Sequence, residues 1–319
     1  MSRGLIFLFP GQSSRDEAMF ARLDRCAPGA GDAAKARVEA TTEKSFDGAF
    51  ASNLDIQAAV FELNVAYLCL ARAAGLEADA SAGLSLGEYS HLVDIGALSD
   101  SEGRDLVAER GRCYDAGPDG AMAALHPIEL MQAESLVHRV CEELDDADAV
   151  AISNINSPSQ CVVAGRRDAV TRVLELADDI HCVLGSIIEP RIPMHVRRFM
   201  PVAAALRPRL ERVRWRSPRR DYWPNVEARA IAAPAPDQIA DHLARHVYER
   251  VQWRATIDAL CANFGDPVFV EVGPRQVLSK MMGRRWIGAA SVFSLDLMED
   301  AGEAAFANTL KEISHAVAS

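Results

Sequence analysis

The residues Gly83-Leu84-Ser85-Leu86-Gly87 form a GxSxG pattern, which is typical of a nucleophile elbow. They lie between a run of small residues that predicts a strand and a segment that predicts a helix. The glycines permit a sharp turn, which places the Ser85 hydroxyl at a helix N-terminus, where backbone N–H groups stabilise negative charge. A Gly-rich turn without chemistry is the plainer interpretation, but the strand–turn–helix context favours a nucleophilic serine.

A nucleophilic serine requires a base, and the chain has eight histidines. His195 follows Ile192-Pro193-Met194, where a central segment of the chain returns to the main domain. Such a junction lines an interdomain cleft, a usual place for catalysis. His91, on the helix after Ser85, is a rival for a place in the site. Spacing alone favours His195 as the base and does not exclude His91 from the site.

Two backbone N–H groups are candidates for an oxyanion hole. In an elbow enzyme one comes from the residue after the nucleophile, here Leu86, and the other from a loop after a neighbouring strand. Gln12, in the turn Phe9-Pro10-Gly11-Gln12, suits the second role. A turn that merely ends the first strand is an equally good interpretation of that segment.

The elements that must position these residues can be predicted from the periodicity of the chain. Residues 4–9 predict a buried strand, 55–75 a buried helix, and 100–113 a helix capped by Asp100 or Ser101. Between Ala121 and Glu189 the pattern changes to strand, helix, strand, strand, helix, strand, which is the ferredoxin-like order. The expected ranges in that order are 121–125, 129–144, 149–155, 160–165, 167–179 and 181–188.

After this segment the chain returns to α/β patterning, with strands expected at 268–273 and 291–296. We therefore predict an α/β protein with an α/β-hydrolase-like large domain, residues 1–120 plus 193–319. A ferredoxin-like small subdomain, residues 121–192, is inserted into it.

Composition narrows the function classes. The net charge of -11 argues against a general nucleic-acid binder. The seven cysteines are scattered and form no CxxC pair, which predicts reduced thiols in a cytoplasmic protein and no metal site. Neither a signal peptide nor an apolar run of about 18 residues is present, so we expect no membrane association.

Arginine is concentrated in one segment. Between Arg191 and Arg229 there are eleven arginines, opposed by only three carboxylates. A basic surface on an acidic protein suits an anionic partner such as an acidic carrier protein or the phosphates of coenzyme A. An arginine-rich solvated helix explains the pattern equally well. The candidate docking residues are Arg207, Arg212, Arg216 and Arg220.

Motifs along almost the whole chain carry a family resemblance. They are Phe9-Pro10-Gly11-Gln12, Gly83-Leu84-Ser85-Leu86-Gly87-Glu88-Tyr89, Arg110-Gly111, Gly120-Ala121-Met122-Ala123-Ala124, Asn154-Ile155-Asn156-Ser157-Pro158, Val163-Ala164-Gly165, Pro193-Met194-His195, Val251-Gln252-Trp253 and Glu271-Val272-Gly273-Pro274. With these motifs the chain resembles the malonyl-CoA:acyl-carrier-protein transacylases of fatty acid and polyketide synthesis. That family includes free-standing acyltransferases that serve modular synthases in trans.

The resemblance implies the two-domain fold and a set of catalytic roles. Ser85 becomes the nucleophile and His195 the general base, while Gln12 and Leu86 supply the oxyanion-hole N–H groups. The family orients its histidine with a main-chain carbonyl, which we map to the Gln252 segment.

The resemblance also implies substrate contacts. Arg110 matches the arginine that pairs with the carboxylate of a malonyl-type group, and Asn156 lies in a further motif of the site. Tyr114 stands where Met often follows that arginine, and Leu84 stands where the family usually has His. Met194 precedes the catalytic histidine, where its bulk favours malonyl over methylmalonyl.

The expected activity is transfer of an acyl group, malonyl above all, from coenzyme A through an acyl-serine to an acyl carrier protein. Coenzyme A enters as a substrate thioester, no cofactor is required, and we expect a monomer. The alternatives are transfer of an aminoacyl or peptidyl group between carriers, an acyl hydrolase that clears stalled carriers, and an inactive carrier-docking protein.

Overall fold

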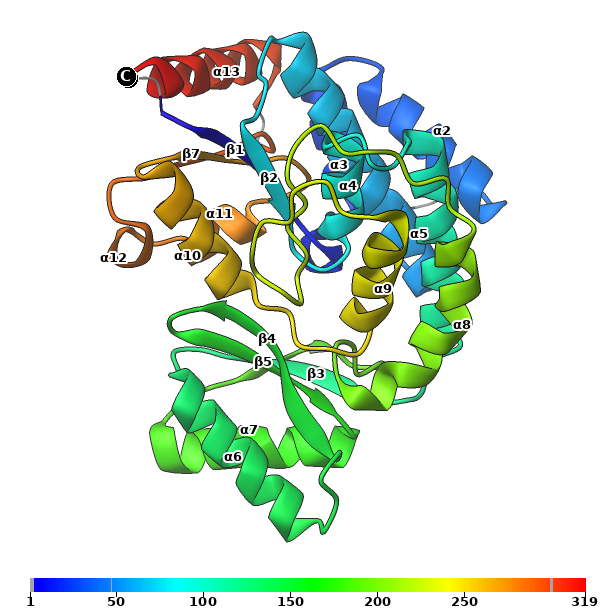
Figure 1. Cartoon of the computed structure of the whole chain (residues 1–319), viewed down its shortest axis with the longest axis vertical. Coiled ribbons are helices and arrows are strands. Elements are labelled where there is room, and N and C mark those ends of the chain that lie inside the picture. Colours follow the sequence, from blue (N-terminus) through cyan, green and yellow to red (C-terminus); the bar gives the residue numbers. More distant parts are fainter. Residues whose placement is uncertain (1–2, 47, 299–300) are drawn as a thin grey trace.

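The computed structural model describes residues 3–46, 48–298 and 301–319, which form two sheets with separate sets of helices. Figure 1 shows the larger part above, around β1, β2 and β7, and the smaller part below, around β3, β4 and β5. The first and the last described elements of the chain belong to the larger part, and the smaller part is built from the middle of the chain. This confirms the predicted fold class.

The large sheet is parallel, with the strand order β2-β1-β7-β8. Its strands are β1 (Leu5–Phe9), β2 (Ala80–Gly83), β7 (Val268–Glu271) and β8 (Ser291–Ser294). The apolar run predicted at residues 4–9 is the fully buried β1. Because Phe9 of β1 is paired with Gly83 of β2, the turns that follow these two strands lie side by side.

Helices cover this sheet on both faces (Figure 1). The helices of the larger part are α1 (Met19–Cys26), α2 (Ala30–Thr42), α3 (Asn53–Ala73), α4 (Gly87–Asp94), α5 (Asp100–Asp115), α8 (Met200–Glu211), α9 (Pro236–His246), α10 (Trp253–Phe264), α11 (Val277–Met281), α12 (Arg284–Ile287) and α13 (Glu303–Ala318), with short 3-10 turns at Gln12–Ser14 (η1) and Arg197–Phe199 (η2). Although α3 is long and apolar enough to cross a membrane by length and composition, it is mostly buried inside the protein.

The N-cap of α5 differs from the prediction. Its cap is Ser99, whose hydroxyl accepts the N–H of Glu102, and not Asp100 or Ser101. A cap residue has extended backbone before the first turn, and Ser99 has that conformation.

The small sheet is antiparallel, with the order β4-β5-β3-β6. Its elements are β3 (Ala121–Leu125), α6 (Leu130–Glu143), β4 (Val150–Ser157), β5 (Gln160–Gly165), α7 (Arg167–His181) and β6 (Ser186–Glu189). This order confirms the ferredoxin-like prediction. The last strand begins later than expected because α7 continues to His181. The limits at residues 120 and 193 stay predictions.

A short backbone bridge joins β4 to the larger part. The N–H of Val251 donates to the carbonyl of Ser153 at 2.8 Å, and the N–H of Ile155 donates to the carbonyl of Val251 at 3.0 Å. Val251 comes shortly after α9 and just before α10. The edge of the small sheet is therefore attached to the loop between two helices of the larger part.

Candidate active site

Ser85 lies in a sharp turn between β2 and α4. Its φ of 53° is in the left-handed region, where residues other than glycine are uncommon. A Cβ at Gly83 would lie 2.0 Å from backbone atoms of Gly87, and one at Gly87 would lie 2.0 Å from the carbonyl oxygen of Phe9. Both positions therefore require glycine, and the segment has the geometry of a nucleophile elbow.

His195 is the histidine that the structure places beside Ser85. The Oγ of Ser85 lies 2.8 Å from Nε2 of His195, and both side chains are buried. The backbone N–H of His195 donates to the carbonyl of Val247 at 3.0 Å, which ties this loop to the end of α9. Burial lowers the pKa of His195 to about 3, so the ring is neutral at pH 7 and can accept the serine proton.

The carbonyl that orients His195 belongs to His246, and the prediction of Gln252 is wrong. Nδ1 of His195 lies 2.6 Å from the His246 oxygen. His246 is the last residue of α9, where helix carbonyls lack partners within the helix. Gln252 is the N-cap of α10, and its carbonyl accepts the N–H of Thr256. A proton on Nδ1 leaves the Nε2 lone pair directed at Ser85.

The His91 ring lies elsewhere, in a buried polar cluster. Nδ1 of His91 lies 2.8 Å from the Ser81 hydroxyl, and Nε2 accepts the N–H of Trp223 at 3.0 Å. Burial lowers its pKa to about 3. Because both of its ring nitrogens are hydrogen-bonded, to Ser81 and Trp223, His91 helps to hold α4 in place and does not contact Ser85.

Gln12 and Leu86 lie in the two turns that follow β1 and β2. Gln12 opens η1 directly after β1, and Leu86 precedes α4. The two turns are in contact, since a Cβ at Gly11 would lie 2.7 Å from the carbonyl oxygen of Leu84. Neither N–H is hydrogen-bonded to any residue that the structure describes. Both are free to receive a negatively charged oxygen.

Arg110, on α5, is buried. Only 1% of it is exposed, and none of its three side-chain nitrogens has a hydrogen-bond partner within the described ranges. Its guanidinium lies 4.1 Å from the ring centre of Tyr114 and 5.4 Å from that of Tyr89. Phe199 packs edge-on against Tyr114 at 4.9 Å. The aromatic rings fix the plane of a guanidinium whose donors have no partner in the described part of the chain, although Arg110 does not line the cavity that contains Ser85 and His195.

A small cavity of about 70 Å³ opens over the dyad. Met194 and Asn156 line it together with Ser85, His195 and Gln12. A neighbouring hollow of about 300 Å³ shares Asn156 with this cavity and also contains Arg275 and Lys280.

Asn225, Glu88 and His246 are residues of the site that sequence reasoning missed. The Asn225 side chain accepts the N–H of Ser85 at 2.9 Å and donates to the carbonyl of Gly83 at 2.6 Å, so it braces the elbow from both sides. Its own N–H donates to Glu88 at 3.2 Å. Glu88 belongs to the motif Gly83–Tyr89, but the sequence assigned it no role. Asn225 and His246 belong to none of the motifs, and nothing in the sequence except their residue type pointed to them.

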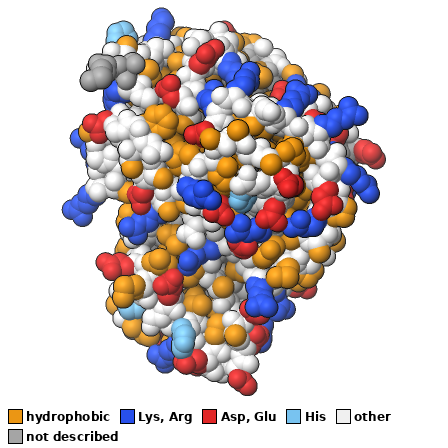
Figure 2. All heavy atoms as spheres, in the orientation of Figure 1, with side chains coloured by type: hydrophobic (Ala, Val, Ile, Leu, Met, Phe, Trp, Pro, Cys, Tyr) orange, Lys and Arg blue, Asp and Glu red, His pale blue; other side chains and the backbone are white. Residues whose placement is uncertain are grey.

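The arginines predicted to dock a carrier differ in their availability. Arg220 is bonded to the buried Asp94 carboxylate at 2.6 Å, so it does not offer its charge to a partner, contrary to the prediction. Arg207 pairs with Asp241 at 3.0 Å. Arg212 and Arg216 are exposed and form no ion pair with a described residue. Figure 2 shows basic and acidic side chains interspersed on this face of the molecule.

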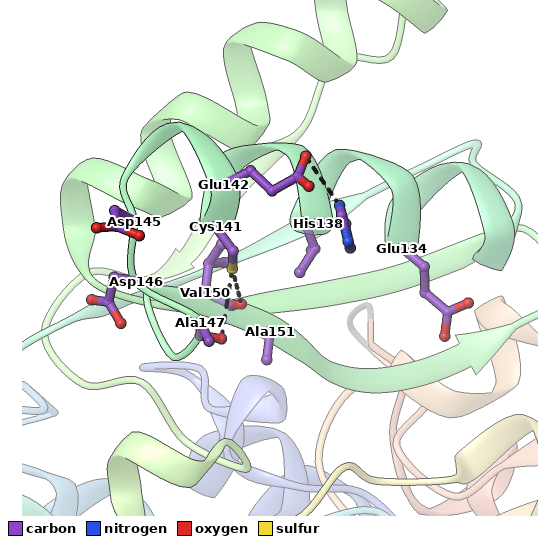
Figure 3. A pocket seen from close by; sticks show the side chains of 10 residues that line it. Glu134, His138, Cys141, Glu142, Asp145, Asp146, Ala147, Val150 and Ala151 are labelled. Atoms are coloured by element: carbon purple, nitrogen blue, oxygen red, sulfur yellow. Dashed lines mark hydrogen bonds and ion pairs between the residues drawn. The ribbon is translucent and has the colours of Figure 1, made fainter.

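A larger hollow, of about 650 Å³, lies apart from the dyad on the small subdomain (Figure 3). Carboxylates from α6 and the loop after it surround it, and His138 pairs with Glu142 at 3.3 Å. The thiol of Cys141 donates to the carbonyl of Val150 at 3.4 Å. No nucleophile–base pair is present among its lining residues. Within the described ranges, no group of three His, Cys, Asp or Glu side chains could hold a metal ion.

Comparison with known proteins identifies the family of the chain. The chain is 29% identical to the malonyl CoA-acyl carrier protein transacylase of Escherichia coli (strain K12) over 289 residues, covering 87% of this chain and 91% of that protein. The crystal structure of FabD from Acinetobacter baumannii matches with a TM-score of 0.86 at 26% identity, over 99% of this chain and 100% of that one. A malonyl-transacylase in complex with a type II polyketide synthase acyl-carrier protein has the same fold, with a TM-score of 0.83 at 24% identity over 97% and 99% of the two chains. Residues 6–290 match the acyl transferase domain family, and the chain belongs to that family.

Proposed function

We propose that this enzyme transfers a malonyl group from coenzyme A, through an ester on Ser85, to the phosphopantetheine thiol of an acyl carrier protein. The observation that carries the proposal is a Ser85–His195 contact of 2.8 Å together with the buried Arg110 guanidinium, whose donors have no partner among the described residues. The first supplies acyl transfer. The second selects an acyl group that ends in a carboxylate.

The first half-reaction acylates the serine. Nε2 of His195 takes the Ser85 proton while Oγ forms a bond to the thioester carbon, and the N–H groups of Gln12 and Leu86 hold the resulting oxyanion. When the carbon–sulfur bond breaks, the imidazolium returns its proton to the departing coenzyme A thiolate. The enzyme then carries the malonyl ester and a neutral His195.

The second half-reaction runs the same steps in reverse order with the carrier as acceptor. His195 takes the proton of the phosphopantetheine thiol, and the sulfur attacks the ester carbon. Ser85 Oγ leaves and recovers the proton from His195. No step needs a redox change, and the residues that perform the first half-reaction also perform the second.

The hollow beside the dyad suits the pantetheine arm that both thioesters share. Arg275 and Lys280 line it and can pair with the phosphate at the far end of the arm. The Glu271 carboxylate accepts the N–H groups of Val277, Leu278 and Ser279 at 2.8–2.9 Å, which fixes α11 and the position of Lys280.

Arg110 and Met194 support malonyl over the alternatives. A buried guanidinium without a carboxylate partner is costly, so a hydrolase for varied acyl chains or a transferase of neutral aminoacyl groups gains nothing from it. Met194 lines the small cavity over the dyad, where its bulk opposes a branched acyl group.

Intact-protein mass spectrometry after incubation with malonyl-, methylmalonyl-, acetyl- and hexanoyl-coenzyme A tests the proposal. We expect a malonyl adduct on Ser85 that persists in buffer and is discharged by a holo carrier protein. An adduct that water removes as fast as the carrier does would make the enzyme a hydrolase. A preference for acetyl or hexanoyl would overturn the malonyl assignment.

Arg212 and Arg216, which follow α8 and form no ion pair with a described residue, support a prediction for the carrier. Arg212→Glu combined with Arg216→Glu should slow transfer to an acidic carrier by about threefold to tenfold, because rim charges govern association. Self-acylation by malonyl-CoA should stay unchanged. Added salt should reduce the difference between the variant and the wild type in the rate of transfer to the carrier. The measurement is the rate of each half-reaction at two salt concentrations.

Lys311→Glu on α13 provides the matched control, since it reverses an exposed charge on the opposite side of the large part (Figure 1). A loss of both half-reactions in the double variant would indicate damage to the fold. Unchanged transfer would remove this surface from carrier docking.

A further inference from the structure

The side chain of His246 packs directly against the catalytic histidine. The two imidazole rings are stacked with their centres 4.8 Å apart and their planes at 16°. Both residues are buried, with exposed fractions of 2% for His195 and 1% for His246. His246 therefore contacts His195 twice, through its carbonyl at Nδ1 and through the face of its ring.

Glu88 holds the other edge of the His246 ring. Oε2 of Glu88 lies 3.1 Å from Nδ1 of His246, in a fully buried setting. The same carboxylate accepts the hydroxyl of Tyr222 and the N–H of Asn225. Three donors thus converge on Glu88 when the His246 proton is on Nδ1. The Nε2 of His246 has no hydrogen-bond partner among the described residues, which fits an uncharged ring with this proton placement.

We propose that Glu88 and the His246 side chain are positioning residues that act through His195. Glu88 orients the His246 ring, and the ring stabilises the imidazolium that His195 becomes when it takes the Ser85 proton. The proposal rests on the acyl-transfer chemistry proposed above but not on the identity of the acyl group.

The need for such support follows from the surroundings of His195. It is fully buried, and its Nδ1 contacts a carbonyl where many serine enzymes have a carboxylate. Burial, and then the charge of Arg110, lower its pKa, so its protonated form is costly. A neutral ring stacked on an imidazolium stabilises the cation through its π face. A hydrogen bond from the His246 ring to a carboxylate increases the electron density of that ring. It also places the Glu88 charge close to His195, with only the His246 ring between them.

Glu88 also connects the catalytic base and the nucleophile through hydrogen-bonded neighbours. Through His246 it reaches the base, and through Asn225 it reaches the N–H of the nucleophile. Because the same carboxylate holds both, a change in its hydrogen bonding alters the base and the elbow together.

The charge of Glu88 gives the proposal a signature in the pH profile. Burial raises the pKa of Glu88 to about 8, against the opposing effects of the Tyr222 and Asn225 donors and the Arg110 charge. The titratable groups facing it are Tyr222, His246 and Arg110, with Tyr89 beside it on α4. The ionised form is the one that holds His246. The rate of self-acylation should therefore rise with pH as Glu88 loses its proton.

The decisive variant is His246→Gln, which keeps the main-chain carbonyl and removes the ring. Self-acylation by malonyl-CoA should slow by about ten- to a hundredfold in kcat, which is the range that loss of an outer-shell partner costs at metal sites. KM should change by less than about twofold, since Arg110 and the oxyanion-hole N–H groups are untouched. The half-reaction from coenzyme A is the one to measure, because its nucleophile is the Ser85 hydroxyl and no attacking thiol has to lose a proton.

Glu88→Gln carries the second arm of the test. It keeps the size of the side chain and removes the charge, so the rise of kcat/KM with pH near 8 should disappear and the rate should stay low throughout. A purely structural role would lower the rate equally at every pH and leave the shape of the profile intact. If His246→Gln proves too unstable in a thermal melt, this profile decides alone.

His138→Gln is the control, because His138 is exposed on α6 and pairs with Glu142 at 3.3 Å, away from Ser85 and His195. It should acylate at the wild-type rate. Turnover of p-nitrophenyl acetate by all variants separates this proposal from the malonyl assignment, since that ester needs only the dyad. Wild-type rates and profiles in both His246→Gln and Glu88→Gln, with either substrate, would overturn the proposal.

Discussion

Ser85→Ala is expected to abolish acyl-enzyme formation and to lower malonyl transfer by at least about 10⁴-fold. The hydroxyl is the group that forms the ester, and no neighbouring side chain can replace it at 2.8 Å from His195 Nε2. Alanine keeps the Cβ, so the left-handed backbone at φ 53° is no more strained than in the wild type. Intact-protein mass spectrometry after incubation with malonyl-CoA should show no added mass.

Ser101→Ala, at an exposed serine in the first turn of α5, is the control and should acylate normally. The assignment of Ser85 fails if the alanine variant still gains a malonyl adduct that a holo carrier protein can discharge. An adduct on a cysteine that the carrier cannot discharge would be a side reaction and would leave the assignment intact.

Arg110→Ala should reduce malonyl transfer by at least a hundredfold, on the order of 3 kcal/mol, because removing one partner of a buried ion pair is strongly destabilising. In the free enzyme the guanidinium nitrogens lack hydrogen-bond partners among the described residues, so we expect the substrate carboxylate to bind them. Acetyl or hexanoyl transfer should be spared or improved, since the variant no longer buries an unpaired charge. The measurement is the ratio of kcat/KM for malonyl-CoA to that for acetyl-CoA.

Arg110→Lys refines this prediction. It keeps a positive charge but loses the planar fork that makes two parallel hydrogen bonds and stacks on Tyr114, so malonyl transfer should stay well below the wild-type rate. General damage to the fold would lower both substrates together. If the wild type loads acetyl as fast as malonyl and the ratio does not change in Arg110→Ala, the carboxylate has no role. Aminoacyl or peptidyl transfer would then be the better hypothesis.

Features set by nearby residues could be predicted from the sequence. The elbow depends on Gly83 and Gly87, two positions where a Cβ would collide with backbone atoms, and glycine is visible in the sequence. The order of strands and helices between Ala121 and Glu189 follows from apolar periodicity, which is also local.

Features that depend on distant contacts were beyond such reasoning. Pattern alone gave His195 no decisive advantage, because its pairing with Ser85 joins residues 110 positions apart. The orienting carbonyl was assigned to Gln252, but it belongs to His246, since the end of α9 and not the start of α10 faces the dyad. The burial of Arg110 depends on Tyr89 and Tyr114 closing over it, which a charge on a helix does not reveal.

The two hydrogen bonds between Val251 and β4 restrict how the small subdomain can move relative to the larger part. Val251 follows His246 and Val247, the residues whose carbonyls hold His195, by only a few positions. If the small subdomain moved away from the larger part at β4, both bonds would have to break or His195 would be pulled away from Ser85. A separation of the two parts that keeps both bonds would therefore open at the opposite edge of the small sheet, at β6. Amide exchange should show this asymmetry, with the N–H groups of Ile155 and Val251 exchanging far more slowly than those of β6.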